Sequence, residues 1–475
     1  TIYKFMGYFL EKFYPYLPPA LQNVGISLFG YYWHKRRFGG VFKKELPAFK
    51  ERENYSRAQW HAYQTSELRK LLTHAFEHVP FYKASFSAAG FSASDLAKIE
   101  LGDLPKLPML EKEDLRRHGT GSLLADNRKP GSFFASSGST GTPTSIYFSN
   151  EMHQRWSAGF EARIRHWAGV NNKMSRGMIG GRRVLPKGHD KPPYYRYNFV
   201  EKQVYFSAYH ISPQTAAQYL QGIKKYKLDY MTGYAASNYF LARFIDELKL
   251  DAPPLKAVIT SSEKLTPDMR QVFERVYHCK SYDSYSGVEA CGLISECEHG
   301  GLHLSEDIGI IEFLDELGNP AQPGAPAEMV CTGLLNFDQP LIRYRIGDMA
   351  VWTPEKCSCG RNMPLVKEIL GRMEDVVVGK DGREMVRFHG IFINLPHVLE
   401  AQLVQENYDQ FVINISSGGK ITPEEKETIT SRMFSQLGPV KIQFNEVNPI
   451  PRGPNGKFKA VISKVTRKKL TSNPM

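Results

Sequence analysis

Residues 136–143 are the stretch of this chain whose residue types and spacing point most clearly to chemistry. Seven small or hydroxylated residues precede Pro143, and the strand-like segment 145–148 follows. Glycines let a backbone approach an anion closely, and backbone N–H groups and hydroxyls supply hydrogen-bond donors without bulk. We therefore predict a polyphosphate-binding loop, although a flexible Gly/Ser linker has a similar composition. The residues expected to hold phosphate are Ser136, Ser137, Gly138, Ser139, Thr140, Gly141 and Thr142.

Four further segments give this loop a context. They are Tyr-Ser-Gly-Val-Glu at 285–289, Arg-Tyr-Arg-Ile-Gly-Asp at 343–348, Gly-Arg-Met-Glu-Asp at 371–375 and Pro-Arg-Gly-Pro-Asn-Gly-Lys at 451–457. The lysine of the Walker G-x-x-x-x-G-K-[ST] pattern is missing, which argues against a P-loop NTPase. In this order and at these spacings, the segments resemble the adenylate-forming (AMP-forming) ligase superfamily, in particular its phenylacetate–CoA ligase-like and CapK capsular polysaccharide biosynthesis branch. The resemblance covers about residues 100–465.

The resemblance implies a role for each motif. Adenylation joins a carboxylate to the α-phosphate of ATP and expels pyrophosphate, so cations and donors must neutralise the charge that develops. Lys457 would lie between the carboxylate and the α-phosphate, Glu289 would bind Mg²⁺, and Arg372 would contact ribose or phosphate. Tyr285 would stack on adenine and Asp348 would accept hydrogen bonds from the ribose hydroxyls. Ser262, Glu263 and Ser286 complete the implied nucleotide-binding set.

Taken singly, these residues have ordinary alternatives. Glu289 could be a surface carboxylate, Asp348 a turn residue, and Lys457 one of several solvated lysines in a basic tail. Two positions also depart from the family pattern: Val288 stands where threonine is usual, and Glu374 where the hinge aspartate is usual. The first departure affects acyl-phosphate contacts and the second affects hinge geometry.

Length, composition and the alternation of strands and helices predict the number of domains and the fold class. A chain of 475 residues with 42% apolar content can bury several cores, and its length predicts two to four domains. Strand–helix alternation between residues 229 and 277 predicts an α/β protein with parallel sheet layers flanked by helices. The resemblance implies the adenylating-enzyme fold, with an N-terminal helical segment over 1–100, a large adenylation domain over 101–371 and a small mobile α+β C-terminal lid domain over 372–475.

Periodicity and turn residues predict the individual elements. Helices are expected over 66–78, 238–248, 267–277, 395–404 and 423–437, and strands over 255–260, 410–415 and 440–446. Residues 233–237 are expected to form a turn between a strand and the second of these helices. Asp381-Gly382 predicts a hairpin over 376–383.

Charge and apolar runs bear on partners and location. The net charge is +12, but no nucleic-acid-binding motif accompanies the basic clusters, so we expect anionic small molecules rather than nucleic acid. No apolar run is long enough to span a bilayer and the start has no signal-peptide layout, which predicts a cytoplasmic protein. The first 40 residues mix aromatic and apolar residues and end in His34-Lys35-Arg36-Arg37. They could pack on the large domain, or lie as an amphipathic segment on the inner face of the membrane.

Six cysteines at irregular spacing fit a reducing compartment better than a disulfide framework. Four soft or borderline ligands in two compact pairs could form a closed tetrahedral zinc site. By resemblance to the phenylacetate–CoA ligase-like branch we choose Cys297, His303, Cys357 and Cys359, with His299 as the alternate. The other reading is two pairs of reduced cysteines in turns. The remaining three cysteines are expected to be small buried apolar residues.

The sequence thus indicates an ATP- and Mg²⁺-dependent ligase that adenylates a small carboxylic acid and transfers the acyl group to an acceptor. Its pocket is expected to draw on Tyr205, His210, Gly233 and Tyr234, and polar aromatic residues over 194–210 suggest a polar or sugar-like acid. The charged segment 383–387 favours an amine or hydroxyl acceptor, which is plausible in polysaccharide assembly. An acyl-CoA synthetase is the alternative, and a non-catalytic nucleotide-binding assembly protein is a second one.

Overall fold

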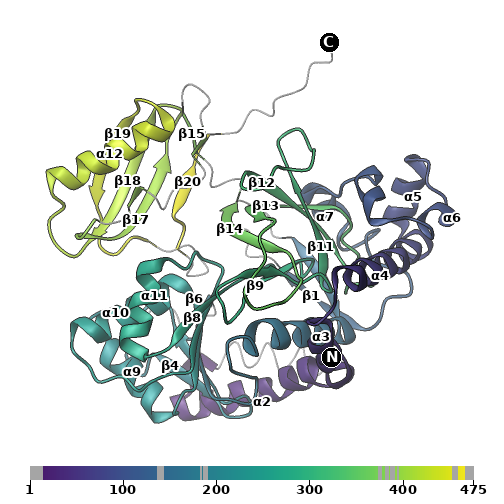
Figure 1. Ribbon diagram of the computed structural model, residues 1–475. Helices are drawn as coiled ribbons and strands as arrows, with labels where there is room; N and C mark the ends of the chain where they lie inside the picture. Colours follow the sequence, from purple (N-terminus) through teal and green to yellow (C-terminus); the bar gives the residue numbers. More distant parts are fainter. Residues whose placement is uncertain are drawn as a thin grey trace. The chain divides into compact units, whose positions relative to one another are not determined.

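The computed structural model describes residues 14–135, 144–181, 184–185, 191–372, 377–379, 384–385, 391–392, 395–451 and 458–465 (Figure 1). The chain divides into two compact units. The first comprises Thr1–Ile346 and Ala350–Ile369, and the second comprises Gly347–Met349 and Leu370–Met475. The helical N-terminal segment is part of the first unit. Among the described residues, no helix has the length and hydrophobicity needed to cross a membrane.

A run of helices opens the first unit. The predicted helix over 66–78 is confirmed but begins earlier, because Ser56 caps it and forms a reciprocal capping box with Gln59. Its inward face buries Leu68, Leu71 and Leu72 completely. The elements of this region are η1 (Tyr14–Tyr16), α2 (Pro19–Phe38), α3 (Phe42–Arg52), α4 (Arg57–His78), α5 (Pro80–Ala88), α6 (Ala93–Leu96), η2 (Leu101–Lys106) and α7 (Lys112–His118).

A hairpin and a long helix follow. The strands β1 (Gly131–Ala135) and β2 (Ser145–Ser149) pair antiparallel, with Ala135 opposite Ser145. The Ser149 side chain then caps α8 (Asn150–Phe160), which continues into one π-helical turn, η3 (Glu161–Arg165). The hairpin therefore fixes both ends of the predicted phosphate loop, although 136–143 themselves lie outside the described residues.

The predicted parallel sheet is confirmed. Strands β3 (Arg176–Gly180), β5 (Gln203–Ser207), β6 (Tyr230–Tyr234), β7 (Ala257–Ser261) and β8 (Lys280–Ser286) pair parallel in the order β8-β7-β6-β3-β5. Helices α9 (Ala216–Lys225), α10 (Ala235–Glu247) and α11 (Pro267–Tyr277) connect them. The expected turn over 233–237 is wrong: β6 runs through Tyr234 and α10 starts at Ala235, because the left-handed Gly233 is accommodated inside the strand.

The same sheet extends to twelve strands, with the full order β11-β12-β13-β14-β10-β9-β8-β7-β6-β3-β5-β4. Antiparallel pairing joins β9 to β8 and β10 to β9. The added strands are β4 (Tyr195–Asn198), β9 (Leu293–Glu296), β10 (Leu302–Leu304), β11 (Gly309–Leu314), β12 (Pro326–Gly333), β13 (Tyr344–Thr353) and β14 (Leu365–Arg372).

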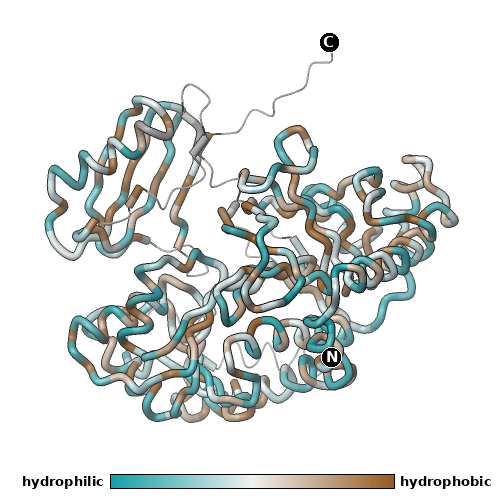
Figure 2. Tube along the Cα trace, viewed as in Figure 1, coloured by the Kyte–Doolittle hydropathy of each residue, from teal (hydrophilic) through white to brown (hydrophobic). Residues whose placement is uncertain are grey.

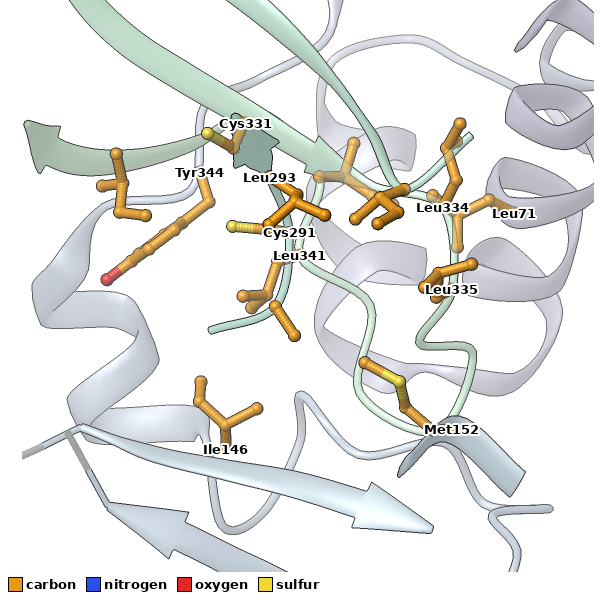
Figure 3. Packing of buried hydrophobic residues seen from close by; sticks show 14 of the residues in the cluster. Leu71, Ile146, Met152, Cys291, Leu293, Cys331, Leu334, Leu335, Leu341 and Tyr344 are labelled. Atoms are coloured by element: carbon orange, nitrogen blue, oxygen red, sulfur yellow. The ribbon is translucent and has the colours of Figure 1, made fainter. Parts of the chain in front are cut away.

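Two large apolar cores hold the first unit together. In one, residues of α4 pack against those of the sheet and its connections: Leu71 lies near Leu334 and Leu335, and Cys291 and Cys331 are buried close by (Figure 3). The other core fills the space between the parallel strands and α9, α10 and α11. Cys279 packs into this second core, so the expectation that these three cysteines are buried is confirmed.

The second unit is built on a four-stranded sheet of order β19-β18-β17-β20, with hydrophobic residues along its strands (Figure 2). The helix predicted over 423–437 and the strands over 410–415 and 440–446 are confirmed. Two short strands pair antiparallel around the predicted hairpin over 376–383, the second of them just beyond its predicted end. The elements are β15 (Val377–Val378), β16 (Glu384–Met385), β17 (Val398–Gln405), β18 (Gln410–Ser417), α12 (Pro423–Leu437), β19 (Lys441–Glu446) and β20 (Val461–Ser463).

The helix predicted over 395–404 is wrong, because this segment forms β17. Its apolar residues recur at helix-like intervals, but the strand is paired on both sides, antiparallel to β18 and parallel to β20. Polar side chains in the segment are buried and paired: the Gln402 amide donates to the Lys459 carbonyl at 2.9 Å and accepts from Asn414 at 3.0 Å. Tertiary pairing therefore overrides the local periodicity.

Candidate active site and metal centre

The carboxyl ends of the parallel strands gather several predicted site residues at one edge of the sheet. Tyr234 at the end of β6 lies opposite Ser261 at the end of β7, and Ser261 lies opposite Ser284 of β8. Ser262 and Glu263 follow β7 directly, and Tyr285 and Ser286 end β8. In open α/β sheets this is the edge at which ligands bind.

Glu263 has a defined partner at this edge. Its Oε2 atom accepts a hydrogen bond of 2.8 Å from the Ala236 backbone N–H, which belongs to the first turn of α10. A carboxylate at a helix N-terminus is stabilised by the helix dipole. Ser262, with φ of 69°, supplies the left-handed turn that directs Glu263 toward this helix. Glu263 thus ties the loop after β7 to the strand–helix junction at Tyr234.

Burial raises the pKa of Tyr234 to about 12, and the neighbouring Glu263 and Tyr209 raise it further. The Tyr234 phenol is therefore a neutral hydrogen-bonding group at physiological pH. Gly233, predicted for the substrate pocket, also has a structural role. Its φ angle is 121°, and a Cβ atom added to it would lie 1.9 Å from the Ile179 carbonyl oxygen of β3. Only glycine therefore permits this strand pairing.

The turn after β8 positions Glu289. A Cβ atom on Gly287 would lie 2.5 Å from the Glu289 Oε2 atom, so this half-buried carboxylate folds back over the glycine. Tyr285, paired with Ile294 of β9, packs against the first core and is also half-buried. The turn therefore holds an acidic side chain and an aromatic ring at the carboxyl edge.

Asp283 is a residue at this edge that the sequence analysis missed. Burial raises the pKa of its carboxyl group to about 7, and the neighbouring Glu296 raises it further, against the effect of Arg270. Its backbone N–H donates to Glu296 Oε2 at 2.7 Å, and Arg270 donates to the same oxygen at 2.8 Å. The available sequence signal was a carboxylate inside an otherwise aromatic and hydroxylated strand, two residues before Tyr285.

Two of the predicted substrate residues lie in different surroundings: His210 is in a packed aromatic cluster, and Tyr205 is within a strand. His210 follows β5, and its Nδ1 atom is 2.7 Å from the Ser207 hydroxyl. The Tyr194 ring stacks on the His210 ring with centroids 5.0 Å apart, and the Tyr219 hydroxyl donates to the Ser207 carbonyl at 2.6 Å. Tyr205 lies within β5, half-buried and opposite Met178 of β3.

Other predicted residues fall elsewhere or outside the described residues. Asp348 lies in β13 and Arg372 ends β14; both belong to the second unit. Lys457 lies outside the described residues, as do 136–143, so these assignments remain predictions.

The four predicted zinc ligands come together in the first unit. One ligand atom from each of Cys297, His303, Cys357 and Cys359 lies within 4.8 Å of the others. The sulfur atoms of Cys297 and Cys357 are 3.6 Å apart, and Cys359 Sγ lies 3.3 Å from His303 Nε2. Tetrahedral zinc, with bonds of about 2.0–2.3 Å, places its ligand atoms roughly 3.5–3.8 Å apart. The cluster therefore fits zinc.

Surrounding groups orient the ligands. His303 Nδ1 lies 3.2 Å from the Met363 carbonyl oxygen, which leaves Nε2 facing the cysteines. A Cβ atom on Gly301 would lie 2.7 Å from Cys357 Sγ, so glycine lets the backbone pass the cluster. The alternate, His299, bonds instead to the Ser358 hydroxyl at 3.0 Å and is outside the cluster.

An apolar and cationic wall closes this site. Trp60, Trp167 and Met363 form a buried cluster with Cys297, and the Trp167 ring lies edge-on to His303 at 5.6 Å. Arg361 lies over the Trp167 ring and pairs with Glu298 at 2.9 Å. Burial raises the pKa of the Cys297 thiol to about 12, and a bound cation is the partner that would hold it as a thiolate.

Comparison with known proteins agrees with the predicted family relationship and fold. Residues 378–464 match the family described as the CapK C-terminal domain. Protein CapK of Staphylococcus aureus is 23% identical over 96% of this chain and 100% of its own length. A phenylacetate–coenzyme A ligase of Thermus thermophilus is 28% identical over 69% of this chain and 74% of its own length.

Among solved structures, 2-hydroxyisobutyryl-CoA ligase in its postadenylation state, in complex with R3-HIB-AMP, has a TM-score of 0.69. It is 22% identical, and the alignment covers 87% of this chain and 91% of that protein. The predicted adenylating-enzyme fold, with a large layered sheet and a smaller C-terminal sheet domain, is thereby confirmed.

Proposed function

We propose that this chain, which belongs to the adenylate-forming ligase superfamily and to its CapK and phenylacetate–CoA ligase-like branch, activates a small carboxylic acid with ATP and passes the acyl group to an acceptor. In the first step a carboxylate oxygen attacks the α-phosphorus of ATP, and pyrophosphate leaves as the acyl-AMP forms. In the second step a nucleophile attacks the acyl carbon and AMP departs with the former carboxylate oxygen.

The observation that carries this assignment is the turn after β8. Glu289, held over Gly287, and Tyr285 lie at the carboxyl edge of the parallel strands, beside the loop of Ser262 and Glu263. An aromatic ring and a carboxylate at this edge suit an adenine ring and a metal-bound triphosphate. Glu289 would hold Mg²⁺, whose charge neutralises the phosphate oxygens when it is bound.

The family resemblance also implies roles for the remaining motif residues. Asp348 would accept hydrogen bonds from the ribose diol, and Arg372 would contact ribose or phosphate. Residues 136–142 would hold the β- and γ-phosphates through backbone N–H groups and hydroxyls. Lys457 would place its ammonium group between the substrate carboxylate and the α-phosphate, where negative charge builds up in the transition state.

A screen of carboxylic acids for ATP-dependent pyrophosphate release tests this function. We expect one class of acid to stimulate release in wild type, and Glu289→Gln to remove most of that stimulation because the amide binds Mg²⁺ poorly. Tyr408→Phe, a change on an exposed tyrosine of the second unit, is the matched control and should be neutral. If a broad panel with polar, sugar-like, aryl and short aliphatic acids gave no stimulation, the non-catalytic alternative would replace the proposal.

The acceptor is proposed to be an amine or a hydroxyl, as polysaccharide assembly would require. Two observations support it: the CapK relative aligns with 96% of the chain, against 69% for the phenylacetate–CoA ligase, and charged residues occupy 383–387. The alternative is coenzyme A, which the solved relatives and the phenylacetate–CoA ligases use according to their names. With the correct acid, saturable and efficient thioester formation would establish the CoA alternative.

A structural zinc ion belongs to the same proposal. Cys297, His303, Cys357 and Cys359 would hold it, joining the end of β9 to β10 and to the segment before β14. Because the protein would supply all four zinc ligands, no coordination position would remain for substrate. We therefore assign the ion a role in stability rather than catalysis.

A further inference from the structure

The helix α2 turns its polar side toward the protein. Its buried residues include Gln22, Ser27 and Gly30. The Ser27 hydroxyl accepts a hydrogen bond of 3.1 Å from the Phe199 backbone N–H, and the Asn23 amide oxygen accepts one of 2.9 Å from the Tyr197 N–H. These bonds attach α2 along β4 and the residues that follow it (Figure 1). These hydrogen bonds hold the N-terminal half of the helix, and Phe38 at its C-terminal end is buried in the first core.

The C-terminal end of α2 is fixed in the same way. Arg36 is buried and donates to His153 Nδ1 at 3.0 Å, to Asn150 Oδ1 at 2.8 Å and to the Phe148 carbonyl at 2.8 Å. Burial lowers the pKa of His153 to about 3, so its ring stays neutral and accepts this bond. Arg37 forms an ion pair with the buried Glu201. Two of the four residues in the basic cluster at 34–37 are therefore structural.

The outward side of α2 is apolar. Leu21, Val24, Leu28 and Tyr31 are 52%, 46%, 65% and 55% exposed. Their spacing of three, four and three residues puts them on one face of the helix. Lys35 continues that face one turn further, and its Nζ atom lies 5.3 Å from the centre of the Tyr31 ring. A helix on the surface of a globular protein normally shows the reverse arrangement, with its apolar face inward.

The segment that contains this face carries charge of a single sign. Residues 12–44 contain no aspartate or glutamate, whereas Lys35, Lys43 and Lys44 are exposed. Basic residues beside an apolar helix face attract anionic lipid headgroups while the apolar side chains enter the interface. Tyrosine and lysine suit this boundary because each has an apolar body and a polar end.

We infer that the face formed by Leu21, Val24, Leu28, Tyr31 and Lys35 is a docking surface for an anionic lipid bilayer, with α2 lying in the plane of the interface. The three–four spacing would also suit a helix of a second copy. Such a seam usually carries charges of both signs at its flanks, and the acid-free segment 12–44 does not supply them. The membrane is thus the occupant that the charge pattern favours.

Flotation of the full chain with vesicles tests this inference. We expect binding to phosphatidylglycerol-containing vesicles, weak binding to pure phosphatidylcholine vesicles, and reduced binding at high salt. Val24→Glu/Leu28→Glu should lower the bound fraction at least about tenfold, because two exposed apolar side chains that would enter the bilayer are replaced by charges of the wrong sign. Leu317→Glu, an 84% exposed leucine in the turn between β11 and β12, is the matched control and should bind as wild type does.

Both altered residues in the double variant are exposed, so thermal unfolding should be unchanged and will report correct folding. Lys35→Glu/Lys43→Glu provides a second test that leaves the four apolar side chains of the face unchanged and should also reduce binding. Failure of wild type to float with either vesicle, or equal flotation of wild type and the α2 variants, would overturn the inference. A dimer in solution that Val24→Glu/Leu28→Glu dissociates, without vesicle binding, would assign the face to a second copy instead.

Discussion

The β8–β9 hairpin carries Glu289 in the turn at one end and Cys297 just beyond the other. At the first end the side chains of Tyr285 and Glu289 are half-buried, and both residues follow the strand pairing at the carboxyl end of β8. At the second end Cys297 and His303 are 1% and 0% exposed, and tryptophans cover them. The first arrangement leaves an acidic and an aromatic side chain half-buried, whereas the second gathers four ligand atoms into a cluster that one small ion would fit.

This difference suggests that the two ends of a single hairpin have different roles. One end would provide the chemistry and the other would hold β9, β10 and the approach to β14 in place. The two sites would then respond independently to substitution: changes at the turn should affect the reaction, and changes at the cluster should affect stability. Substitutions at the two ends can therefore show whether activity and stability are independent.

Lys457→Ala should have the largest effect. A charge-assisted contact made in the transition state contributes roughly 3–4 kcal/mol, so acyl-AMP formation should fall about 10²–10³-fold. Acyl transfer from a supplied acyl-adenylate should be affected much less, and the zinc content should stay the same. The two half-reactions are to be measured separately by rapid quench, and equal losses in both would contradict the role assigned to Lys457.

Removing two ligands of the cluster should affect stability instead. Protein purified without added metal should contain near one zinc per chain by elemental analysis, and Cys357→Ser/Cys359→Ser should lose it. The unfolding temperature should fall by about 5 °C or more, because metal binding is coupled to folding of the native site. His299→Ala changes a neighbouring histidine that is outside the cluster and should keep the metal. Zinc-free wild type with unchanged stability would refute the site.

Two glycines offer a crossed test of the separation. In Gly287→Ala the new Cβ atom would lie 2.5 Å from Glu289 Oε2, so the carboxylate group must move. This should reduce activity about tenfold, with little change in stability or zinc content. Gly301→Ala presses on Cys357 Sγ at 2.7 Å and should weaken zinc binding and cost ~1–2 kcal/mol of stability. Activity and zinc content measured on both variants decide the matter: parallel losses in the two proteins would show that the ends are coupled.

The smallest effect should come from Asp283, which lies in β8 beside Glu296, the last residue of β9. Because its raised pKa of about 7 favours the protonated form in the native protein, its stabilising contribution is present below about pH 4 and is lost as the pH rises through 7. Wild type should therefore lose ~1–2 kcal/mol relative to Asp283→Asn between pH 5 and pH 8, a value reduced by solvent screening. Urea unfolding across this range measures the difference in unfolding free energy between the two proteins. If Asp283 had an ordinary pKa, this difference would not change between pH 5 and pH 8.

Local signals explain which parts of the fold the sequence could predict. The helix over 267–277 has a Thr266 cap, Pro267 at its first position and a clear apolar stripe, and both of its ends were predicted correctly. The segment 395–404 has helix-like spacing, and only its pairing with β18 and β20 makes it a strand. Local periodicity contains no information about such long-range partners.

The candidate site shows the same limit. Cysteine and histidine spacing indicated a metal cluster, but the preference of His303 over His299 rested on resemblance until Ser358 was seen to engage the His299 ring. The close approach of Gly233 to Ile179 could not be predicted, because it depends on how β3 and β6 pair. The perturbed pKa of Asp283 depends on Glu296, which lies on the neighbouring strand.

Transfer of an isotope from the acid to AMP tests the central claim most directly. With the acid that stimulates pyrophosphate release, labelled with ¹⁸O in its carboxylate, the protein should release AMP that contains one ¹⁸O atom after acyl transfer. This follows because the carboxylate oxygen bonds to the α-phosphorus and stays there when the acyl group leaves. Mass spectrometry of the AMP reads the outcome. Unlabelled AMP, or ADP with labelled inorganic phosphate, would contradict adenylation of the acid.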